Sequence, residues 1–276
     1  MSAPIDFRIK LCYNNNMNTG ISTACIFNRC ETEDSFAILK QLGVQSCELF
    51  LQTFYEYRPD FAGKYASRAE GLMVDSVHVM SLHFESQLLW QSLRQRGDSY
   101  YWLEQVMRSA QIFGVKNYTF HGIVRKQGEG NDDFDRLGER LREAVAFCAK
   151  YGVRLCLENV RWSLYNRPSV FSELKRRCPD LSGTFDIKQA RLSGYPYAMF
   201  IEDMKGAISQ VHLSDVDENG RTCLPGKGVY NFTEIFKRLK DAGFNGNVFI
   251  EDINFGELSE LKQSLDFINE IVYKIN

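Results

Sequence analysis

A short pattern recurs along this chain: a glycine, an apolar run of strand length, and then a residue that can bind a metal or transfer a proton. The clearest copy is GVRLCLENV, residues 152–160, in which Glu158 ends the apolar run. Further copies lead from Gly43 to Glu48, from Gly114 to His121 and from Gly243 to Glu251. Glycine readily adopts the left-handed conformation that ends a helix, so each copy predicts a helix followed by a strand. Repeated units of this kind predict an α/β fold.

The same pattern locates the elements along the chain. Strands are expected at residues 7–12, 45–51, 74–80, 181–187, 208–213 and 246–253, with two more ending at His121 and Glu158. The polar segment NNNMNTG, residues 14–20, is expected to be a loop after the first strand. Helices are expected at 32–42 with Thr32 as its cap, at 59–71, from Asp98 to 113, at 131–151, 169–177, 231–242 and 258–275, with a less regular region around Pro196.

Eight alternating strand and helix units predict a (β/α)8 barrel, the TIM-barrel fold. We expect a single α/β domain over residues 1–276, because no linker rich in Pro, Gly or Ser interrupts the pattern. An open doubly wound sheet is the alternative. No GxGxxG motif follows the first predicted strand, so the usual nucleotide-binding signature of that fold is missing.

Composition narrows the class of protein. The chain has 33 Lys and Arg against 35 Asp and Glu, a net charge of -2 that gives no general attraction to nucleic acid or to an anionic membrane. Its eight cysteines form no CxxC pair, and we expect free thiols in a reducing cytoplasm. No apolar run approaches the about 18 residues of a membrane span, and the N-terminus has no apolar signal core.

Four polar residues end the last four predicted strands: Glu158, Asp186, His212 and Glu251. In a barrel, the carboxyl ends of all strands lie on one rim, so these side chains are expected to converge. Taken singly, each would more often be a helix cap or a hydrogen-bonded core residue. Charged groups within apolar strand ends such as LCLEN and VFIED need a partner, however, and a divalent cation would supply it. A mixed set of oxygen and nitrogen ligands suits Mn²⁺, Co²⁺, Mg²⁺ or Zn²⁺; ligand type predicts only a weak preference among them, and Mn²⁺ is the ion favoured here.

Several segments, in order, resemble the xylose isomerase-like TIM-barrel family of sugar and sugar-phosphate isomerases and epimerases: LCLENV, GTFDIKQA, VHLSDVDENG, LPGKGVYNFTEIFKRLKDAGFNG and VFIED. The resemblance to its ketose 3-epimerases implies one metal ion held by Glu158, Asp186, His212 and Glu251. It also implies that Glu158 and Glu251 form the catalytic proton-transfer pair. Such a pair suits an isomerisation beside a carbonyl, which needs a base and an acid on opposite faces of one carbon.

Substrate contacts are expected from His78, His121 and Glu48 at earlier strand ends. They are also expected from Lys188 and Gln189, just after the end of the predicted strand 181–187. Arg161, Trp162 and Tyr165 could form a wall or simply pack at the surface. Two positions depart from the resemblance. Gln189 stands where many relatives have His, and Glu218 stands where many epimerases have Arg.

The expected function is therefore a metal-dependent isomerase or epimerase of a small ketose, sugar phosphate or related hydroxy ketone, active in the cytoplasm as part of carbohydrate metabolism. An inosose dehydratase-like lyase is a close variant, since it begins with the same proton abstraction. Alternatives are an abasic-site nuclease similar to endonuclease IV, which needs a three-metal cluster, and a non-catalytic barrel. A sugar or polyol is the expected partner, without nucleic acid or membrane, and relatives suggest a homodimer or homotetramer.

Overall fold

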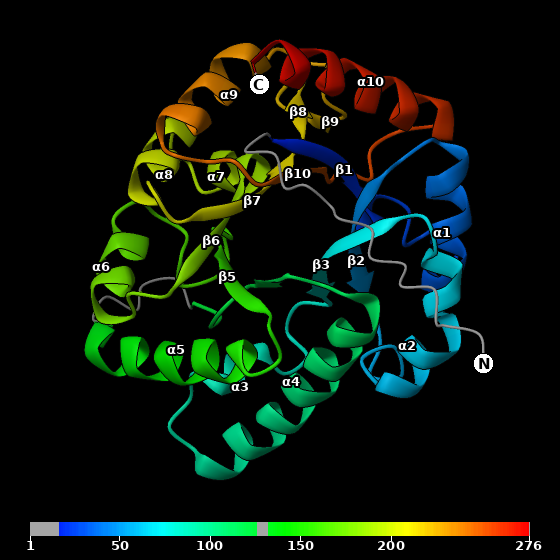
Figure 1. Cartoon of the computed structure of the whole chain (residues 1–276). Helices are drawn as coiled ribbons and strands as arrows, with labels where there is room; N and C mark the ends of the chain where they lie inside the picture. Colours follow the sequence, from blue (N-terminus) through cyan, green and yellow to red (C-terminus); the bar gives the residue numbers. More distant parts are fainter. Residues whose placement is uncertain (1–16, 126–131, 276) are drawn as a thin grey trace, which may run out of the picture.

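The structure is a computed structural model that describes residues 17–125 and 132–275. Its centre is a closed barrel of parallel strands in the order β1-β10-β7-β6-β5-β4-β3-β2 (Figure 1). The strands are β1 (Asn18–Ser22), β2 (Ser46–Leu51), β3 (Met73–Val79), β4 (Asn117–Phe120), β5 (Arg154–Glu158), β6 (Ser182–Asp186), β7 (Ile208–Leu213) and β10 (Asn247–Ile250). The predicted (β/α)8 barrel is confirmed, and the open doubly wound sheet is excluded because the barrel closes through β1 and β10.

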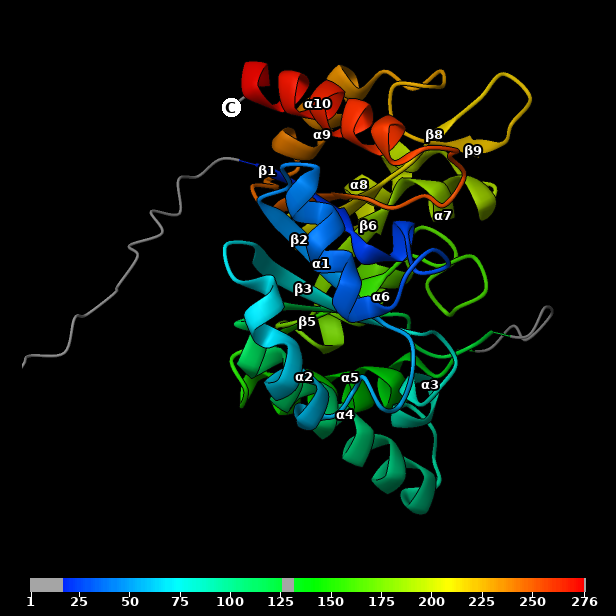
Figure 2. The same cartoon turned by 90° about the vertical axis from the view of Figure 1, so that its right-hand side faces the viewer.

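Helices surround the barrel (Figures 1 and 2). They are α1 (Thr32–Gln41), α2 (Pro59–Tyr65), α3 (Glu85–Leu88), α4 (Leu93–Phe113), α5 (Phe134–Ala149), α6 (Val170–Arg177), α7 (Ile187–Leu192), α8 (Tyr197–Asp203), α9 (Phe232–Asp241) and α10 (Leu258–Ile275), with 3-10 turns η1 (Thr23–Cys25) and η2 (Ala66–Ala69). Among the described residues, no helix is both long and apolar enough to cross a lipid bilayer.

Helix α9 illustrates why the outer helices form where they do. The side chain of Asn231 caps its start by accepting the backbone N–H of Glu234. Its buried residues recur at helical spacing and cover one face of the helix: Phe232, Ile235, Phe236 and Leu239. Gly243 follows the helix at a φ of 85°, a conformation that glycine adopts without a steric penalty. The amphipathic pattern thus buries one side of α9 against the barrel.

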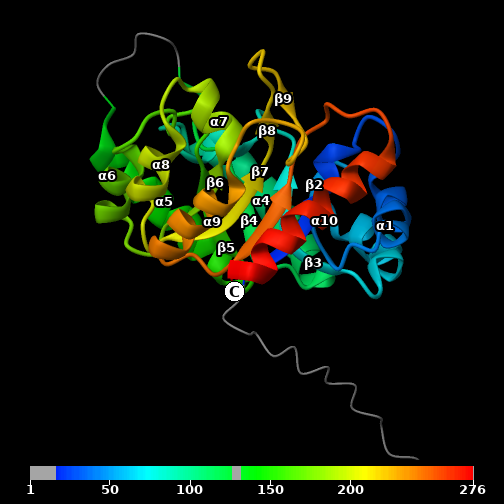
Figure 3. The ribbon, with the colours of Figure 1, turned by 90° about the horizontal axis from the view of Figure 1, so that it is seen from above.

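A small antiparallel hairpin adds to the barrel after β7. It pairs β8 (Asp215–Val216) with β9 (Thr222–Cys223). Figure 2 shows the hairpin on the same side of the molecule as α3 and α7, and Figure 3 shows it projecting beyond the barrel. Helix α7 directly follows the carboxyl end of β6, so this is the rim on which the functional residues were predicted to meet.

The prediction for the first barrel strand is wrong. Residues 7–12 lie outside the described residues, and the strand that closes the barrel is β1, which overlaps the segment predicted to be a loop. A β-carbon added at Gly20 would lie 2.2 Å from the Ser46 carbonyl oxygen, so glycine allows β1 to approach β2. Pairing with β10 and β2 therefore makes a strand from a segment whose composition is typical of a loop.

Two predicted helix starts are also corrected. Glu31 occupies the cap position of α1, and Thr32 is the first helical residue. Helix α4 begins before Asp98: Ser92 caps it and accepts the backbone N–H of Gln95. The predicted helix at 59–71 consists of α2 followed by the 3-10 turn η2. These shifts leave the order of the elements unchanged.

Candidate active site

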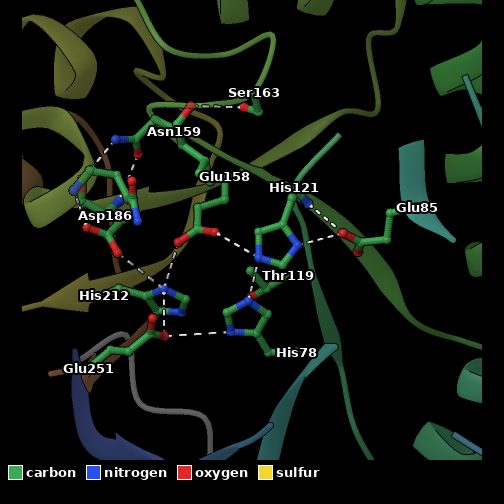
Figure 4. A network of polar contacts seen from close by, with 12 residues as sticks. His78, Glu85, Thr119, His121, Glu158, Asn159, Ser163, Asp186, His212 and Glu251 are labelled. Carbon is green, nitrogen blue, oxygen red and sulfur yellow. Dashed lines mark hydrogen bonds and ion pairs between the residues drawn. The ribbon is translucent and has the colours of Figure 1, made fainter. Parts of the chain in front are cut away.

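The four predicted ligand residues lie together at one end of the barrel. Glu158 and Asp186 are the last residues of β5 and β6, His212 lies in β7, and Glu251 directly follows β10. These strands are neighbours in the barrel, and Figure 4 shows the four side chains pointing toward one another. Three of the side chains are almost completely buried, and Glu251 is 14% exposed.

His212 is the centre of this group. Its Nδ1 lies 3.0 Å from Glu158 Oε1, 3.1 Å from Glu251 Oε2 and 3.9 Å from Asp186 Oδ2. Ligand atoms that share an ion at bond lengths of about 2.0–2.3 Å lie roughly 3–4 Å apart. Ligand atoms of Glu158, Asp186 and His212 all lie within 4.8 Å of one another, a spacing that suits one ion, whereas Glu251 shares such a group with His212, Glu48 and His78.

The electrostatics of the group also fit a cation. Burial raises the pKa of Asp186 to about 7; Lys188 opposes this rise, while the nearby carboxylates of Glu158 and Glu251 add to it. Glu251 Oε2 is buried and has no hydrogen-bond partner of good geometry among the described residues. A divalent ion would relieve the repulsion between the carboxylates and would give Oε2 of Glu251 a coordination partner.

Glu48 lies beneath the site. It is 0% exposed and is followed by three more residues of β2. Along that strand, it lies roughly 10 Å before the last residue. Its Oε1 is 3.0 Å from His212 Nε2 and 3.3 Å from His78 Nδ1. Burial alone would raise the pKa of Glu48, but His212 and His78 hold it well below its usual range. The expected substrate contact of Glu48 is therefore revised to a contact with these two histidines.

His78 and His121 form a pair at the rim. Their Nε2 atoms are 2.8 Å apart, and His121 Nε2 is also 3.6 Å from Glu158 Oε2. Ligand atoms of His78, His121 and Glu158 lie within 4.8 Å of one another, which makes a third group able to hold a cation. Burial alone would lower the pKa of His78, but Glu48 and Glu251 raise it to about 10.

Glu85 is a site residue that the sequence did not reveal. It is 1% exposed, and its carboxylate lies 2.5 Å from His121 Nδ1 (Figure 4). It belongs to α3, a helix of four residues inside the connection between β3 and α4. No periodic pattern marks so short an element, so sequence reasoning had no signal for it.

A cavity of about 360 Å³ opens beside these groups. Six of the predicted site residues line it: His78, His121, Glu158, Lys188, Gln189 and Glu251. Part of the wall is apolar and aromatic, with Phe27, Phe50 and Trp162. Polar residues not predicted from the sequence complete it: Ser81, Thr222, Asp252 and Asn254. The cavity thus combines ionisable groups with an apolar wall, as small-molecule sites usually do.

Lys188 and Gln189 reach the cavity from the start of α7. Lys188 Nζ donates to the Glu251 carbonyl oxygen at 3.3 Å and lies 3.8 Å from Glu251 Oε1. Gln189 Oε1 accepts the backbone N–H of Arg161 at 3.2 Å. Trp162 contributes to the wall, whereas Tyr165 is 0% exposed and packs in the core.

The comparisons with known proteins agree with the fold. Residues 36–271 match the family model described as xylose isomerase-like TIM barrel. The chain belongs to this family. In a curated relative, the uncharacterized protein MJ1311 of Methanocaldococcus jannaschii, 145 residues are 32% identical. The match covers 48% of this chain and 49% of the relative, so it spans about half the length of that protein.

Two solved structures are similar over almost the whole chain. A D-tagatose 3-epimerase-like protein has a TM-score of 0.73 at 22% identity, covering 93% of this chain and 100% of its own. D-psicose 3-epimerase from Clostridium cellulolyticum, solved with D-tagatose, has a TM-score of 0.75 at 17% identity, covering 93% and 99%. At this level of identity the likeness shows a shared fold.

Proposed function

We propose that this protein is a divalent-metal-dependent isomerase or epimerase of a small ketose or related hydroxy ketone. The observation that carries the proposal is the position of His212 Nδ1, which faces carboxylate oxygens from three different strands at the spacing of an ion site. The family and the ketose 3-epimerases among the similar structures support the same reaction class.

Glu158, Asp186, His212 and Glu251 would hold the ion, with Mn²⁺ favoured. When bound, the ion would stabilise the negative charge that develops on the substrate oxygens during enolisation. Asp186 and His212 act as ligands only, since both are buried and neither lines the cavity. These two residues would thereby hold the ion beside the cavity that Glu158 and Glu251 line.

Glu158 and Glu251 are the proposed acid and base. Both line the cavity, and they come from β5 and from the end of β10, on the two sides of His212. One carboxylate removes the proton from the carbon beside the carbonyl, and the other returns a proton to the opposite face or to the neighbouring carbon. Inversion at one carbon gives epimerisation, and delivery to the neighbouring carbon gives isomerisation.

The remaining wall would orient the substrate. Lys188 and His121 present polar groups for hydroxyl oxygens, and Trp162 presents an aromatic face for the apolar side of a sugar. Gln189 can bond a hydroxyl only in part, because its side-chain oxygen already accepts a backbone N–H.

Solvent exchange tests the proposal. The parent protein, loaded with Mn²⁺ and incubated in D2O with a panel of ketoses that includes D-tagatose, is expected to incorporate deuterium beside the carbonyl. Glu158→Gln and Glu251→Gln should each slow incorporation by about 100-fold or more, because general acid–base groups contribute about 10²–10⁴-fold. Asp75→Asn is the control: Asp75 is a buried carboxylate lining a separate cavity at the opposite end of the barrel. Retained exchange in both glutamate variants would remove the proposed proton-transfer pair.

A second candidate is a nuclease similar to endonuclease IV. The observation in its favour is the group of His78, His121 and Glu158, which could hold a further ion. Gln189 occupies the position where a third-ion histidine is expected, which disfavours a complete three-metal cluster. Three zinc ions per chain together with cleavage of abasic-site DNA would support the nuclease, and one ion with ketose exchange would support the isomerase.

A further inference from the structure

Glu85 accepts hydrogen bonds at both of its carboxylate oxygens. Its Oε1 accepts the Tyr118 hydroxyl at 2.5 Å. Its Oε2 accepts the backbone N–H of His121 at 3.3 Å and contacts Nδ1 of the same imidazole at 2.5 Å. Because the Glu85 carboxylate already accepts from the Tyr118 hydroxyl and from a backbone N–H, we assign the proton in the imidazole contact to His121 Nδ1.

This contact determines the other edge of the His121 ring. A neutral imidazole with its proton on Nδ1 presents a lone pair at Nε2. That atom lies 2.8 Å from His78 Nε2, so with this tautomer of His121 we assign the proton between the two rings to His78. The result is a directed chain in which His78 donates to His121 and His121 donates to Glu85.

The two histidines also lie beside the two carboxylates assigned to proton transfer. His121 Nε2 lies 3.6 Å from Glu158 Oε2, and His78 Nδ1 lies 3.6 Å from Glu251 Oε2. Figure 4 shows His121 beside Glu158 and His78 beside Glu251, with Glu85 on the side of His121 that faces away from His212. A side chain that fixes the two rings therefore also determines which ring nitrogens face the two glutamates.

We propose that Glu85 is a positioning residue that acts through His121 and His78 to hold Glu158 and Glu251 in place for proton transfer. This proposal rests on the proposed isomerase function for its kinetic consequence only. The directed chain itself is a property of the folded protein and can be measured without a substrate.

Nuclear magnetic resonance of ¹⁵N-histidine protein measures the chain directly, because the protein has four histidines and each can be assigned by substitution. In the parent protein we expect the His121 Nδ1 signal to be that of a protonated nitrogen and Nε2 that of an acceptor. Glu85→Gln should change the His121 and His78 signals more than those of His83, since His83 Nδ1 contacts the Tyr57 hydroxyl and is influenced by Glu85 only through its charge. A protonated Nε2 on His121 in the parent, or unchanged signals in Glu85→Gln, would overturn the proposal.

Kinetics and metal binding separate positioning from general damage. Glu85→Gln is expected to lower kcat for deuterium exchange by about 10- to 100-fold, the range expected from loss of a charged hydrogen bond, with a smaller change in KM. Its Mn²⁺ affinity should change less than kcat, because Glu85 reaches Glu158 and Glu251 only through the two histidines and touches neither Asp186 nor His212. Glu56→Gln is the matched control, a buried glutamate that accepts backbone N–H groups of residues 52 and 53 away from the histidines.

The two proposals fail in different ways. A parent protein without exchange on any ketose would count against the isomerase, and the histidine signals would then decide the role of Glu85 alone. If exchange occurs and Glu85→Gln retains the parent kcat, the positioning role is refuted while the isomerase stands.

Discussion

Asp215→Asn should destabilise the protein strongly, because Asp215 organises the loop that borders the cavity. Its Oδ2 accepts the backbone N–H groups of Gly226 and Gly228, each at 3.1 Å. Its Oδ1 accepts those of Val216 at 2.8 Å and Tyr230 at 3.0 Å. The carboxylate is 1% exposed, so these four donors are its partners and water does not share it with them.

The structure sets the size of the effect. Asparagine presents one acceptor oxygen, and its NH2 group would face two of the N–H donors. Two hydrogen bonds to a charged acceptor, each contributing about 1.5–3 kcal/mol, would be lost, for a total of about 3–6 kcal/mol. For a domain of this size that predicts a fall in Tm on the order of 10 °C or more.

Differential scanning calorimetry measures this shift, and Asp217→Asn is the control in the same loop. Asp217 accepts two backbone hydrogen bonds, from the N–H groups of Asn219 and Arg221, and both go to the same oxygen, Oδ1. Asparagine keeps that oxygen, so the Tm of Asp217→Asn should stay near that of the parent. Equal Tm values for the two variants would refute the reasoning.

Metal loading and two glycine substitutions give further predictions. Mn²⁺ at about 100 times its Kd should stabilise the protein by about 2.7 kcal/mol and raise the Tm by roughly 5–10 °C. A chelator should reverse this shift in Tm, and Asp186→Asn should remove it. A parent Tm that does not change with divalent ions would contradict the proposed metal site. Gly63→Ala in α2 should stabilise the fold by about 0.5–1 kcal/mol, because an added β-carbon meets no atom within 4 Å. Gly20→Ala should reduce the Tm or the soluble yield, because the added β-carbon would lie 2.2 Å from the Ser46 carbonyl oxygen; a parent-like Gly20→Ala protein would refute the close approach of β1 to β2.

The sequence predicted the barrel because its strongest signal is local and repeated. A glycine, an apolar strand and a polar end recur, and the parallel barrel is the closure that brings such ends together. For the same reason, the positions of Glu158, Asp186, His212 and Glu251 on one rim could be expected before any coordinates. Their roles as ligands stay predictions until an ion is observed.

Other features depend on contacts between distant segments, which a local pattern does not contain. Strand β1 becomes a strand only through its pairing with β2 and β10. The depth of Glu48 follows from the register of β2 in the barrel, where Glu48 pairs with Ser76 and three strand residues still follow. Glu85 is brought to His121 by a connection with no periodicity of its own.

Crystals soaked in Mn²⁺ and measured for anomalous scattering would test the central claim most directly. The account predicts one strong peak within bonding distance of Glu158, Asp186, His212 and Glu251. A soaked crystal without a peak among these side chains, or with its ion bound elsewhere, would contradict the proposed metal site and the reaction built on it.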